Sequence, residues 1–268
     1  MFSILRPYIF NFDPETAHDL AIKSLKLNLI PETFFKVQGE EILETNFFGK
    51  KFKNPIGLAA GFDKSAEVYN SLYKLGFGFV EVGTITPKRQ LGNVKPRIFR
   101  LEKDGAMINR LGFNNDGVEI VSKRIANNLP KGILGINIGP NKDTENKEED
   151  FFICLSKLYL HADYITINIS SPNTEGLRDF HEHKALSSLL TRITKLKKEK
   201  KISKPLLVKI SPDINDRNIS EVIELIIKHK IEGIIISNTS DRTRENLIDN
   251  QKNEKGGLSG KPIKEIST

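Results

Sequence analysis

Short apolar runs alternate along this chain with longer stretches of helical periodicity, beginning near residue 55. Each short run is almost continuously apolar, as expected of strands that are buried on both faces of a parallel sheet. The intervening stretches 185–200 and 219–229 repeat apolar residues at helical spacing. The pattern therefore predicts an α/β fold with crossover helices. The expected strands are Pro55–Ala60, Phe79–Thr84, Leu134–Gly139, Tyr164–Ile169, Pro205–Ile210 and Gly233–Asn238.

The spacing of these strands indicates which α/β architecture to expect. Their starts are about 36 residues apart on average, close to the roughly 30 residues of a βαβ unit. A TIM (β/α)8 barrel would need two further units, on the order of 70 residues beyond Thr268. We therefore expect a TIM barrel of which this chain carries about six units and lacks the C-terminal ones. An open six-stranded sheet is the alternative.

The residues before the first expected strand do not fit this repeat. Asp13 and Pro14 form a helix-start signal, with Asp13 as the cap and Pro14 at the first helical position. Pro31 opens a second short helical segment that contains Phe34 and Phe35. Such an amphipathic segment either caps the bottom of the barrel or faces lipid. We divide the chain into a helical segment, residues 1–45, and a barrel, residues 46–268, which begins with a hairpin around Gly49.

Composition narrows the classes of function only a little. The chain has 268 residues, of which 38% are hydrophobic, so it can bury a sizeable core. Its formal net charge of +7 leaves nucleic acid, anionic lipid and small anionic substrates open as partners. Cys154 is the one cysteine, which fits a reducing compartment such as the cytosol and excludes a multi-cysteine metal site; we expect no metal. The basic stretch 192–201 keeps an apolar stripe typical of a crossover helix with a charged outer face.

Polar side chains follow the expected strands, at the rim where α/β folds place their chemistry. Amides present donors and acceptors together, which suits a heterocycle with alternating carbonyl and N–H groups. Lys209 stands between Val208 and Ile210 in a strand expected to be buried, so its ammonium needs a bound anion or an electron-rich cofactor as partner. The set at the rim comprises Lys64, Lys209, Asn109, Asn137, Asn168, Asn173 and Asn238.

Six segments at this rim resemble dihydroorotate dehydrogenase of the quinone-dependent class. The likeness runs in order over essentially the whole chain, and Asn-x-Ser-Ser-Pro-Asn together with Asn-Arg-x-Gly-Phe-Asn-Asn is highly specific. The stretch from Asp13 to His18 is similar to the N-terminal helices that distinguish this class from the soluble classes. The six segments are Leu58–Lys64, Glu81–Pro87, Asn109–Asn115, Gly135–Gly139, Asn168–Thr174 and Gly256–Gly260.

The resemblance implies a TIM-barrel flavoprotein that oxidises (S)-dihydroorotate to orotate in de novo pyrimidine (UMP) biosynthesis, with FMN as hydride acceptor and a membrane quinone as terminal acceptor. It also implies peripheral association, through the N-terminal helices, with the cytoplasmic face of the inner (cell) membrane. Ser171 would be the general base that removes the C5 proton. The positions matched to substrate binding are Lys64, Asn109, Arg110, Leu111, Gly112, Phe113, Asn168, Asn173, Asn238 and Thr239. The positions matched to FMN are Ala60, Gly61, Lys64, Thr84, Asn137, Asn168, Lys209, Ser237 and Gly260.

Three other functions stay open at this point. A soluble-class dihydroorotate dehydrogenase using fumarate or NAD would carry a cysteine base, whereas Cys154 lies in a helical stretch. A flavin barrel acting on RNA would use the positive charge, although we expect no nucleic-acid partner, and an inactive fragment would follow from the missing units. We expect the helical segment to lie outside the substrate-binding residues. Its apolar face, suited to an isoprenoid tail or lipid, is Leu20, Leu25, Leu29, Phe34 and Phe35.

Overall fold

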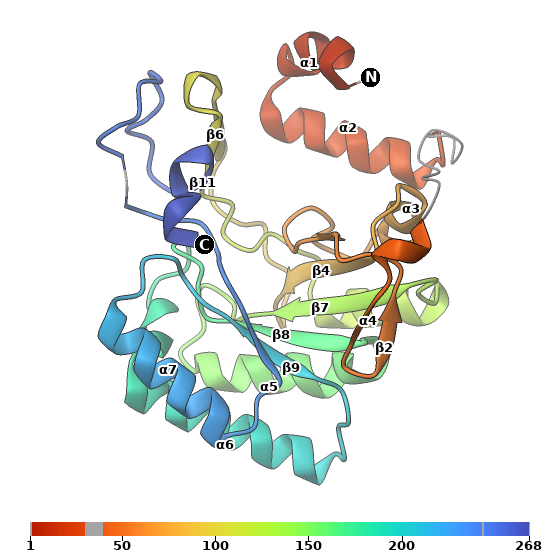
Figure 1. Ribbon diagram of the computed structural model, residues 1–268, viewed down its shortest axis with the longest axis vertical. Helices are drawn as coiled ribbons and strands as arrows, with labels where there is room; N and C mark the ends of the chain where they lie inside the picture. Colours follow the sequence, from red (N-terminus) through yellow and green to blue (C-terminus); the bar gives the residue numbers. More distant parts are fainter. Residues whose placement is uncertain (1, 30–39, 243, 268) are drawn as a thin grey trace.

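A curved parallel sheet forms the centre of the molecule in the computed structural model, which describes residues 2–29, 40–242 and 244–267 (Figure 1). Among these residues the sheet has six strands in the order β10–β9–β8–β7–β4–β3, and every neighbouring pair is parallel. Each strand overlaps one of the six expected runs, which confirms the predicted α/β barrel-type fold. The strands are β3 (Gly57–Leu58), β4 (Phe79–Ile85), β7 (Ile133–Ile138), β8 (Tyr164–Asn168), β9 (Leu206–Lys209) and β10 (Gly233–Ile235).

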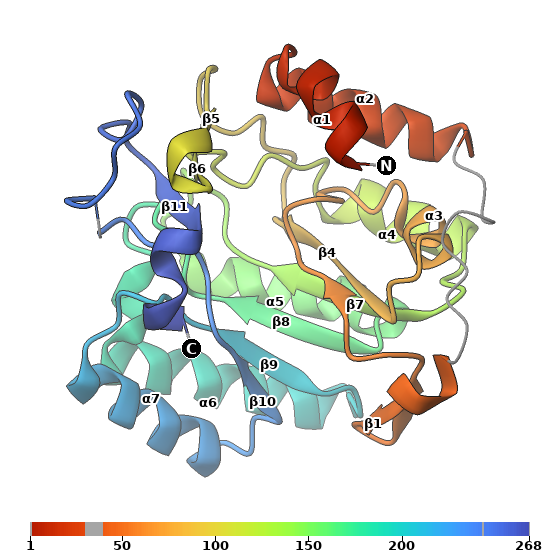
Figure 2. The same cartoon turned by 45° about the horizontal axis from the view of Figure 1, so that its top comes forward.

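Helices cover the outer face of this sheet (Figures 1 and 2). In α6 the apolar stripe, including Leu189 and Ile193, is fully buried against the sheet. The basic residues of the same helix therefore lie on its outer side, as the pattern predicted. The helices that follow strands of this sheet are α3 (Tyr69–Lys74), α4 (Val118–Asn127), α5 (Lys147–Leu158), α6 (His183–Glu199) and α7 (Asp216–Lys228).

Two helices precede the sheet, α1 (Phe2–Phe10) and α2 (Pro14–Lys26). The predicted start of α2 is confirmed, because Asp13 Oδ1 accepts hydrogen bonds from the backbone N–H groups of Glu15 and Thr16, both at 3.0 Å. Sequence patterning did not predict α1. The segment expected after Pro31, with Phe34 and Phe35, lies outside the described residues.

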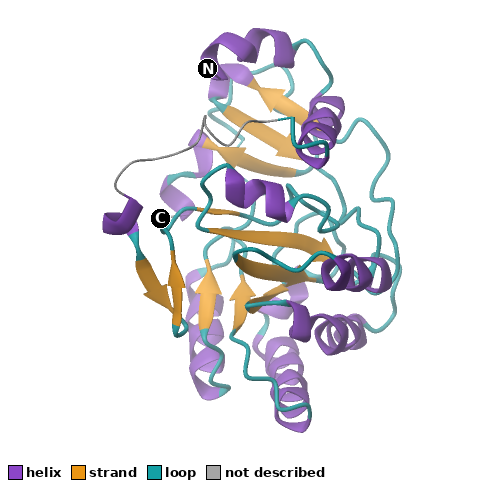
Figure 3. Cartoon of the chain, turned by 90° about the vertical axis from the view of Figure 1, so that its right-hand side faces the viewer, coloured by secondary structure: helices purple, strands orange, loops and turns teal. Residues whose placement is uncertain are grey.

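The hairpin expected around Gly49 is also confirmed. It consists of β1 (Thr45–Phe47) and β2 (Lys50–Phe52), which are antiparallel and lie beside the barrel sheet (Figure 3). Short 3-10 turns occupy Glu40–Leu43, Glu102–Asp104, Tyr159–His161, Arg178–His181, Lys261–Ile263 and Glu265–Ser267.

Helix α2 is packed firmly onto the barrel. Leu25 belongs to the main hydrophobic core, so its expected place on a lipid-facing surface is wrong, whereas Leu20 and Leu29 are exposed. Glu15 and Arg97 are both buried and form an ion pair, with Arg97 Nη2 at 2.6 Å from Glu15 Oε1. Burial raises the pKa of Glu15, but the hydrogen bonds from Arg97 and Lys95 outweigh this effect and hold the pKa below its usual value. The division at residue 45 stays a prediction.

A second, three-stranded antiparallel sheet lies on the same side of the barrel as α1 and α2 (Figures 1 and 3). It consists of β5 (Ile98–Leu101), β6 (Ala106–Asn109) and β11 (Gly257–Gly260), in the order β11–β6–β5. A small core of its own, which includes Phe99, Leu101, Ile108 and Leu258, holds the three strands together. None of these three strands was among the strands expected from the sequence. Together with α2, this small sheet forms the walls above the ends of the parallel strands.

Candidate active site

A cavity of about 350 Å³ lies at the carboxyl ends of the parallel strands, between the barrel, the small sheet and α2. It brings together most of the residues that the sequence assigned to substrate or cofactor. These are Ala60, Gly61, Lys64, Thr84, Asn109, Leu111, Gly112, Phe113, Asn168, Ser171, Asn173, Lys209, Asn238 and Thr239. It also includes residues that the sequence did not single out: Pro14, His18, Gly83, Ile98, Arg100, Met107 and Asn114.

The floor of this cavity is built from small residues over a buried polar network. Gly61 has φ +111°, and a Cβ added there would meet no atom within 4 Å. Beneath it, Thr84 Oγ1 donates to Asn137 Oδ1 at 2.7 Å, and Asn168 Nδ2 donates to Thr84 Oγ1 at 3.0 Å. Asn137 is fully buried and does not line the cavity, so it supports the floor rather than forming it.

Glu81 anchors this network from below, inside the barrel. Its two carboxylate oxygens accept hydrogen bonds from Asn137 Nδ2 and Thr166 Oγ1, both at 2.8 Å. A buried carboxylate with several donors fixes the orientation of the amide that it binds. Sequence analysis missed Glu81. The feature that could have identified it is its position as a charged residue within a mostly apolar expected strand.

Lys209 is the last residue of β9 and only 8% exposed, at the edge of the cavity. Among the residues that the structure describes, no carboxylate lies within ion-pairing distance of its ammonium. Burying an ammonium in such a place costs desolvation free energy unless a bound group accepts its hydrogen bonds. The arrangement favours a ligand with an anionic or electron-rich edge at this point.

Ser171 follows β8 and is 5% exposed. The backbone N–H of Asn173 donates to Ser171 Oγ at 3.2 Å, and Asn173 Nδ2 donates to the carbonyl oxygen of Asn109 at 3.1 Å. The loop that carries the serine is therefore attached to β6 of the small sheet. The amide N–H at Ser171 Oγ would stabilise negative charge that develops on this oxygen.

A neighbouring loop carries Asn238 and Thr239 into the same cavity. Asn238 Nδ2 donates to Ser170 Oγ at 2.9 Å, which joins this loop to the serine loop. Arg178 ties the two loops together further: it donates to the carbonyl oxygens of Ser170 and Thr239 at 3.2 and 3.1 Å and pairs with Asp213 at 3.1 Å. Arg178 was not predicted, because its role depends on contacts between loops far apart in sequence.

Lys64 connects the cavity to α2. Its Nζ lies 3.1 Å from His18 Nε2, and His18 lines the cavity with it. Burial lowers the pKa of Lys64 to about 8, although the charges of Glu15 and Asp19 act against this shift. The expectation that the N-terminal helices lie outside the substrate-binding residues is therefore wrong. The helix sits over the strand ends and supplies part of the wall.

Some assigned residues lie elsewhere. The Arg110 side chain lies outside this cavity, since its guanidinium pairs with Glu254 at 2.6 Å and lies over the ring of Phe99. Ser237 and Gly260 line a separate hollow next to the cavity, and Asn238 belongs to both. The structure thus gathers most of the assigned residues around one space, with Ser237 and Gly260 beside it, Asn137 beneath its floor and the Arg110 side chain outside it.

Three further observations concern alternative chemistries. Cys154 is fully buried in α5, where burial raises the pKa of its thiol well above the usual value, and it does not line the cavity. Within the described parts of the chain, no group of three or more His, Cys, Asp or Glu side chains is placed to hold a metal ion. No helix in those same parts is both long and apolar enough to cross a membrane.

Comparison with known proteins gives a consistent result. The sequence model of the family described as "Dihydroorotate dehydrogenase" matches residues 42–268. "Dihydroorotate dehydrogenase (quinone)" of Christiangramia forsetii is 46% identical over 99% of this chain and 80% of that protein, and its counterpart in Idiomarina loihiensis is 45% identical over 100% and 82%. The crystal structure of an Eimeria tenella dihydroorotate dehydrogenase in complex with ferulenol is 40% identical, with a TM-score of 0.88 over 95% of this chain and 74% of that one.

Proposed function

Since this chain belongs to the dihydroorotate dehydrogenase family, we propose that it oxidises dihydroorotate to orotate for pyrimidine biosynthesis and passes the electrons to a quinone. The observation that supports this most strongly is the one cavity that gathers Ser171, Lys64, Lys209 and the amides of Asn109, Asn168, Asn173 and Asn238. Together they provide a base, a cation for a carboxylate and amides for a ring with alternating carbonyl and N–H groups.

The substrate would bind above the serine loop. Dihydroorotate carries one carboxylate, for which the Lys64 ammonium is a suitable partner. Its ring carbonyl and N–H groups match the amides of Asn109, Asn173 and Asn238, which line the same space. We assign the remaining positions of the matched set, Leu111, Gly112, Phe113, Asn168 and Thr239, to the surrounding walls. Arg110 would act from outside by holding the segment that carries them.

Oxidation requires loss of a proton from C5 and a hydride from C6. We assign proton removal to Ser171, whose Oγ already accepts a hydrogen bond from the Asn173 N–H. As Oγ takes the C5 proton, its own hydroxyl proton passes to water, and the Asn173 N–H stabilises the negative charge that builds up on the oxygen during this exchange. The tie from Asn173 to Asn109 keeps the serine loop against the small sheet, so the base and the ring-binding amides move as one unit.

The hydride acceptor is a flavin, because the family is flavin-dependent, and we propose FMN. The residues present fit it: a floor of Ala60, Gly61 and Thr84 suits a flat ring, and the ammonium of Lys209, which has no carboxylate partner among the described residues, suits its electron-rich edge. Bound FMN would supply the two-electron acceptor for the hydride. Ser237 and Gly260 would extend this site into the adjoining hollow, and Asn137 would hold the floor from beneath.

Quinone would enter from the α2 side. Pro14 of α2 and Ile98, Met107 and Leu111 of the small sheet region line the cavity and would offer apolar contacts to a quinone. Arg100 joins the rim of the cavity to the helices by donating to the carbonyl oxygen of Phe12 at 2.8 Å. Tyr8, Ile9, Phe12, Leu20 and Leu27 are exposed large apolar residues on α1 and α2, between them or directly after α2. These features support peripheral association of the helices with a membrane, and we propose that it occurs on the cytoplasmic face.

The pKa of Lys64 leads to a prediction for substrate binding. A pKa of about 8 means that the ammonium is charged below pH 8 and loses its charge above it. The KM for dihydroorotate should therefore be constant between pH 6 and 7.5 and rise by up to about tenfold per pH unit above 8. Lys64→Met is the matched control, because it removes the titrating group and should give a high KM without this break. A flat wild-type KM up to pH 9 would contradict the assignment of Lys64.

The choice of electron acceptor separates this function from its alternatives. Purified protein loaded with FMN should form orotate from dihydroorotate with a short-chain quinone, and not with fumarate or NAD. Cys154→Ser should leave this activity unchanged, because the thiol is buried in α5 away from the cavity. Orotate formation with fumarate or NAD in place of quinone would favour a soluble-class enzyme instead.

A further inference from the structure

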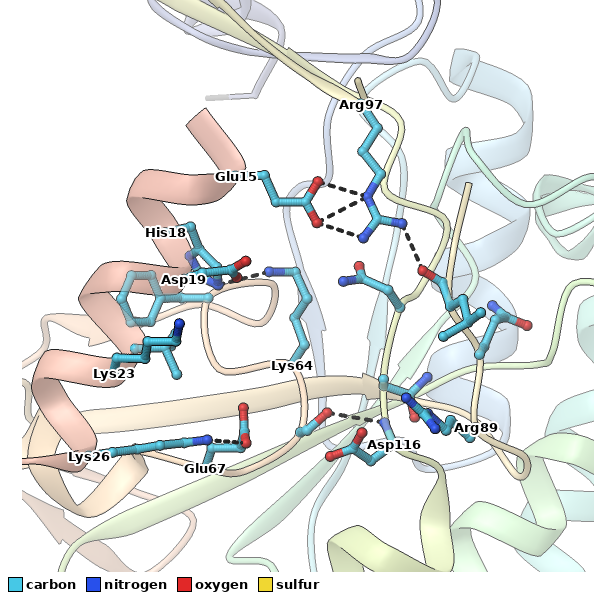
Figure 4. A pocket seen from close by; sticks show the side chains of 17 residues that line it. Glu15, His18, Asp19, Lys23, Lys26, Lys64, Glu67, Arg89, Arg97 and Asp116 are labelled. Atoms are coloured by element: carbon cyan, nitrogen blue, oxygen red, sulfur yellow. Dashed lines mark hydrogen bonds and ion pairs between the residues drawn. The ribbon is translucent and has the colours of Figure 1, made fainter. Parts of the chain in front are cut away.

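A second cavity, of about 390 Å³, lies on the other side of Lys64, between α2 and the loop before β5 (Figure 4). His18, Lys64 and Asn114 line both this charged cavity and the active-site cavity described above. Figure 4 shows the Lys64 side chain reaching toward α2, where it meets His18. The pair of Lys64 and His18 therefore stands between the two spaces.

His18 is held in one orientation. Its ring packs edge-on against Phe62, with centroids 5.0 Å apart and planes at 80°. Burial, followed by the nearby charge of Lys64, lowers the pKa of His18 to about 4. The imidazole is therefore neutral near pH 7, while Lys64 is protonated. The ammonium donates, and His18 Nε2 accepts at 3.1 Å.

The other charged groups around Lys64 are engaged elsewhere or do not bond to it. Glu15 is paired with Arg97, and Glu67 is paired with Lys26. Asp63 accepts the backbone N–H groups of Glu67 and Val68. Asp19 and Arg97 influence Lys64 through their charges. Within the described residues, His18 is the one side chain that hydrogen-bonds to Lys64.

We propose that His18 is a positioning residue for dihydroorotate: by accepting one N–H of Lys64, it directs the remaining N–H groups of the ammonium toward the substrate carboxylate. An ammonium has three donors in tetrahedral arrangement, so fixing one of them restricts the directions of the other two. A flexible lysine without this contact would have to be ordered by each substrate molecule, which weakens binding. Helix α2 is then part of the substrate site. This inference rests on the proposed function.

Two substitutions separate the hydrogen bond from packing. His18→Phe keeps an aromatic ring beside Phe62 but removes the acceptor, whereas His18→Gln offers an amide oxygen near the place of Nε2. With FMN-loaded protein at pH 7, calorimetry should show orotate binding about tenfold weaker in His18→Phe, as for a lost charge-assisted hydrogen bond. His18→Gln should stay within about threefold of the wild type. The FMN content of both variants should equal that of the wild type.

Anaerobic mixing with dihydroorotate, with no quinone present, gives a second readout. His18→Phe should raise the substrate concentration for half-maximal flavin reduction and leave the limiting rate nearly unchanged. In the double variant His18→Phe/Lys64→Met, affinity should be no weaker than in Lys64→Met alone, because His18 acts through Lys64.

Three results would overturn the inference. One is wild-type orotate affinity in His18→Phe with slowing confined to reoxidation by quinone. Another is an equal loss in His18→Phe and His18→Gln, which would indicate packing rather than the hydrogen bond. The third is an additive loss in the double variant. A wild-type protein that neither binds orotate nor is reduced by dihydroorotate would instead contradict the proposed function itself.

Discussion

Replacing Ser171 by alanine should slow the reduction of bound flavin by dihydroorotate by a factor on the order of 10²–10⁴, the range for loss of a general base. The side chain is nearly buried in the cavity, and its Oγ accepts the Asn173 N–H. Removing it takes away the proton acceptor without disturbing a residue of the cavity floor. Rapid mixing under anaerobic conditions measures the rate directly.

Ser171→Cys and Ser171→Ala differ only in whether a proton acceptor is present. The thiol can still take the proton, so Ser171→Cys should be less impaired than Ser171→Ala. FMN content and orotate affinity should be close to wild type in both variants. Equal rates of flavin reduction in the wild type and Ser171→Ala would show that another group removes the C5 proton.

Lys209→Met should slow flavin reduction strongly without lowering the melting temperature of the FMN-free protein. Loss of a preorganised charge at a reaction centre lowers rates by about 10²–10³. The protein without FMN should melt at the same or a higher temperature, because an apolar chain of similar length replaces a mostly buried ammonium that has no carboxylate partner in the described part of the chain. Stopped-flow measurement of flavin reduction tests the predicted loss of rate, and thermal melts of FMN-free protein test the predicted melting temperature.

Lys209→Arg is the control, since it keeps the charge at this strand end. It should retain more of the flavin reduction rate than Lys209→Met. If Lys209→Met instead lowered the melting temperature of the FMN-free protein and left flavin reduction unchanged, Lys209 would be a structural residue of β9 rather than part of the cofactor site.

The parallel sheet could be predicted from sequence because short, mostly apolar runs recur at the spacing of βαβ units. Strand β8 is buried along its whole length, and its polar residues Thr166 and Asn168 make hydrogen bonds inside the barrel. The start of α2 was equally clear, since Asp13 caps the helix through backbone groups two and three residues away and Pro14 occupies its first position. Features that depend on neighbouring residues in the chain were thus recovered well.

The small antiparallel sheet was missed although part of its signal was present. Between Ile98 and Asn109 two short runs flank Asp104-Gly105, with Phe99, Leu101 and Ile108 buried. An Asp-Gly pair between such runs is a hairpin signal, and Gly105 has φ +58°. The third strand, β11, could not be assigned in this way, because it pairs with β6 across about 150 residues of chain.

The candidate site residues also fall into those that the sequence could indicate and those whose roles depend on contacts between distant segments. Lys64 and Lys209 could be placed at the rim because they lie at or after the ends of parallel strands, whereas Ser171 was assigned through the family resemblance. His18 and Arg178 could not be placed, since their roles depend on packing between distant segments: α2 against the loop after β3, and one rim loop against another. The sequence resemblance also carried Arg110 into the site, whereas its side chain faces Glu254.

The central claim is that dihydroorotate delivers its electrons to a flavin in this cavity and that a quinone removes them. The most direct measurement is the visible absorption of the FMN-loaded protein under anaerobic conditions, first with dihydroorotate alone and then with a short-chain quinone. The account predicts loss of the oxidised-flavin absorbance on the first addition, with one orotate formed per flavin, and its return on the second. A flavin that stays oxidised with saturating dihydroorotate, or one that is reduced but not reoxidised by quinone, would contradict it.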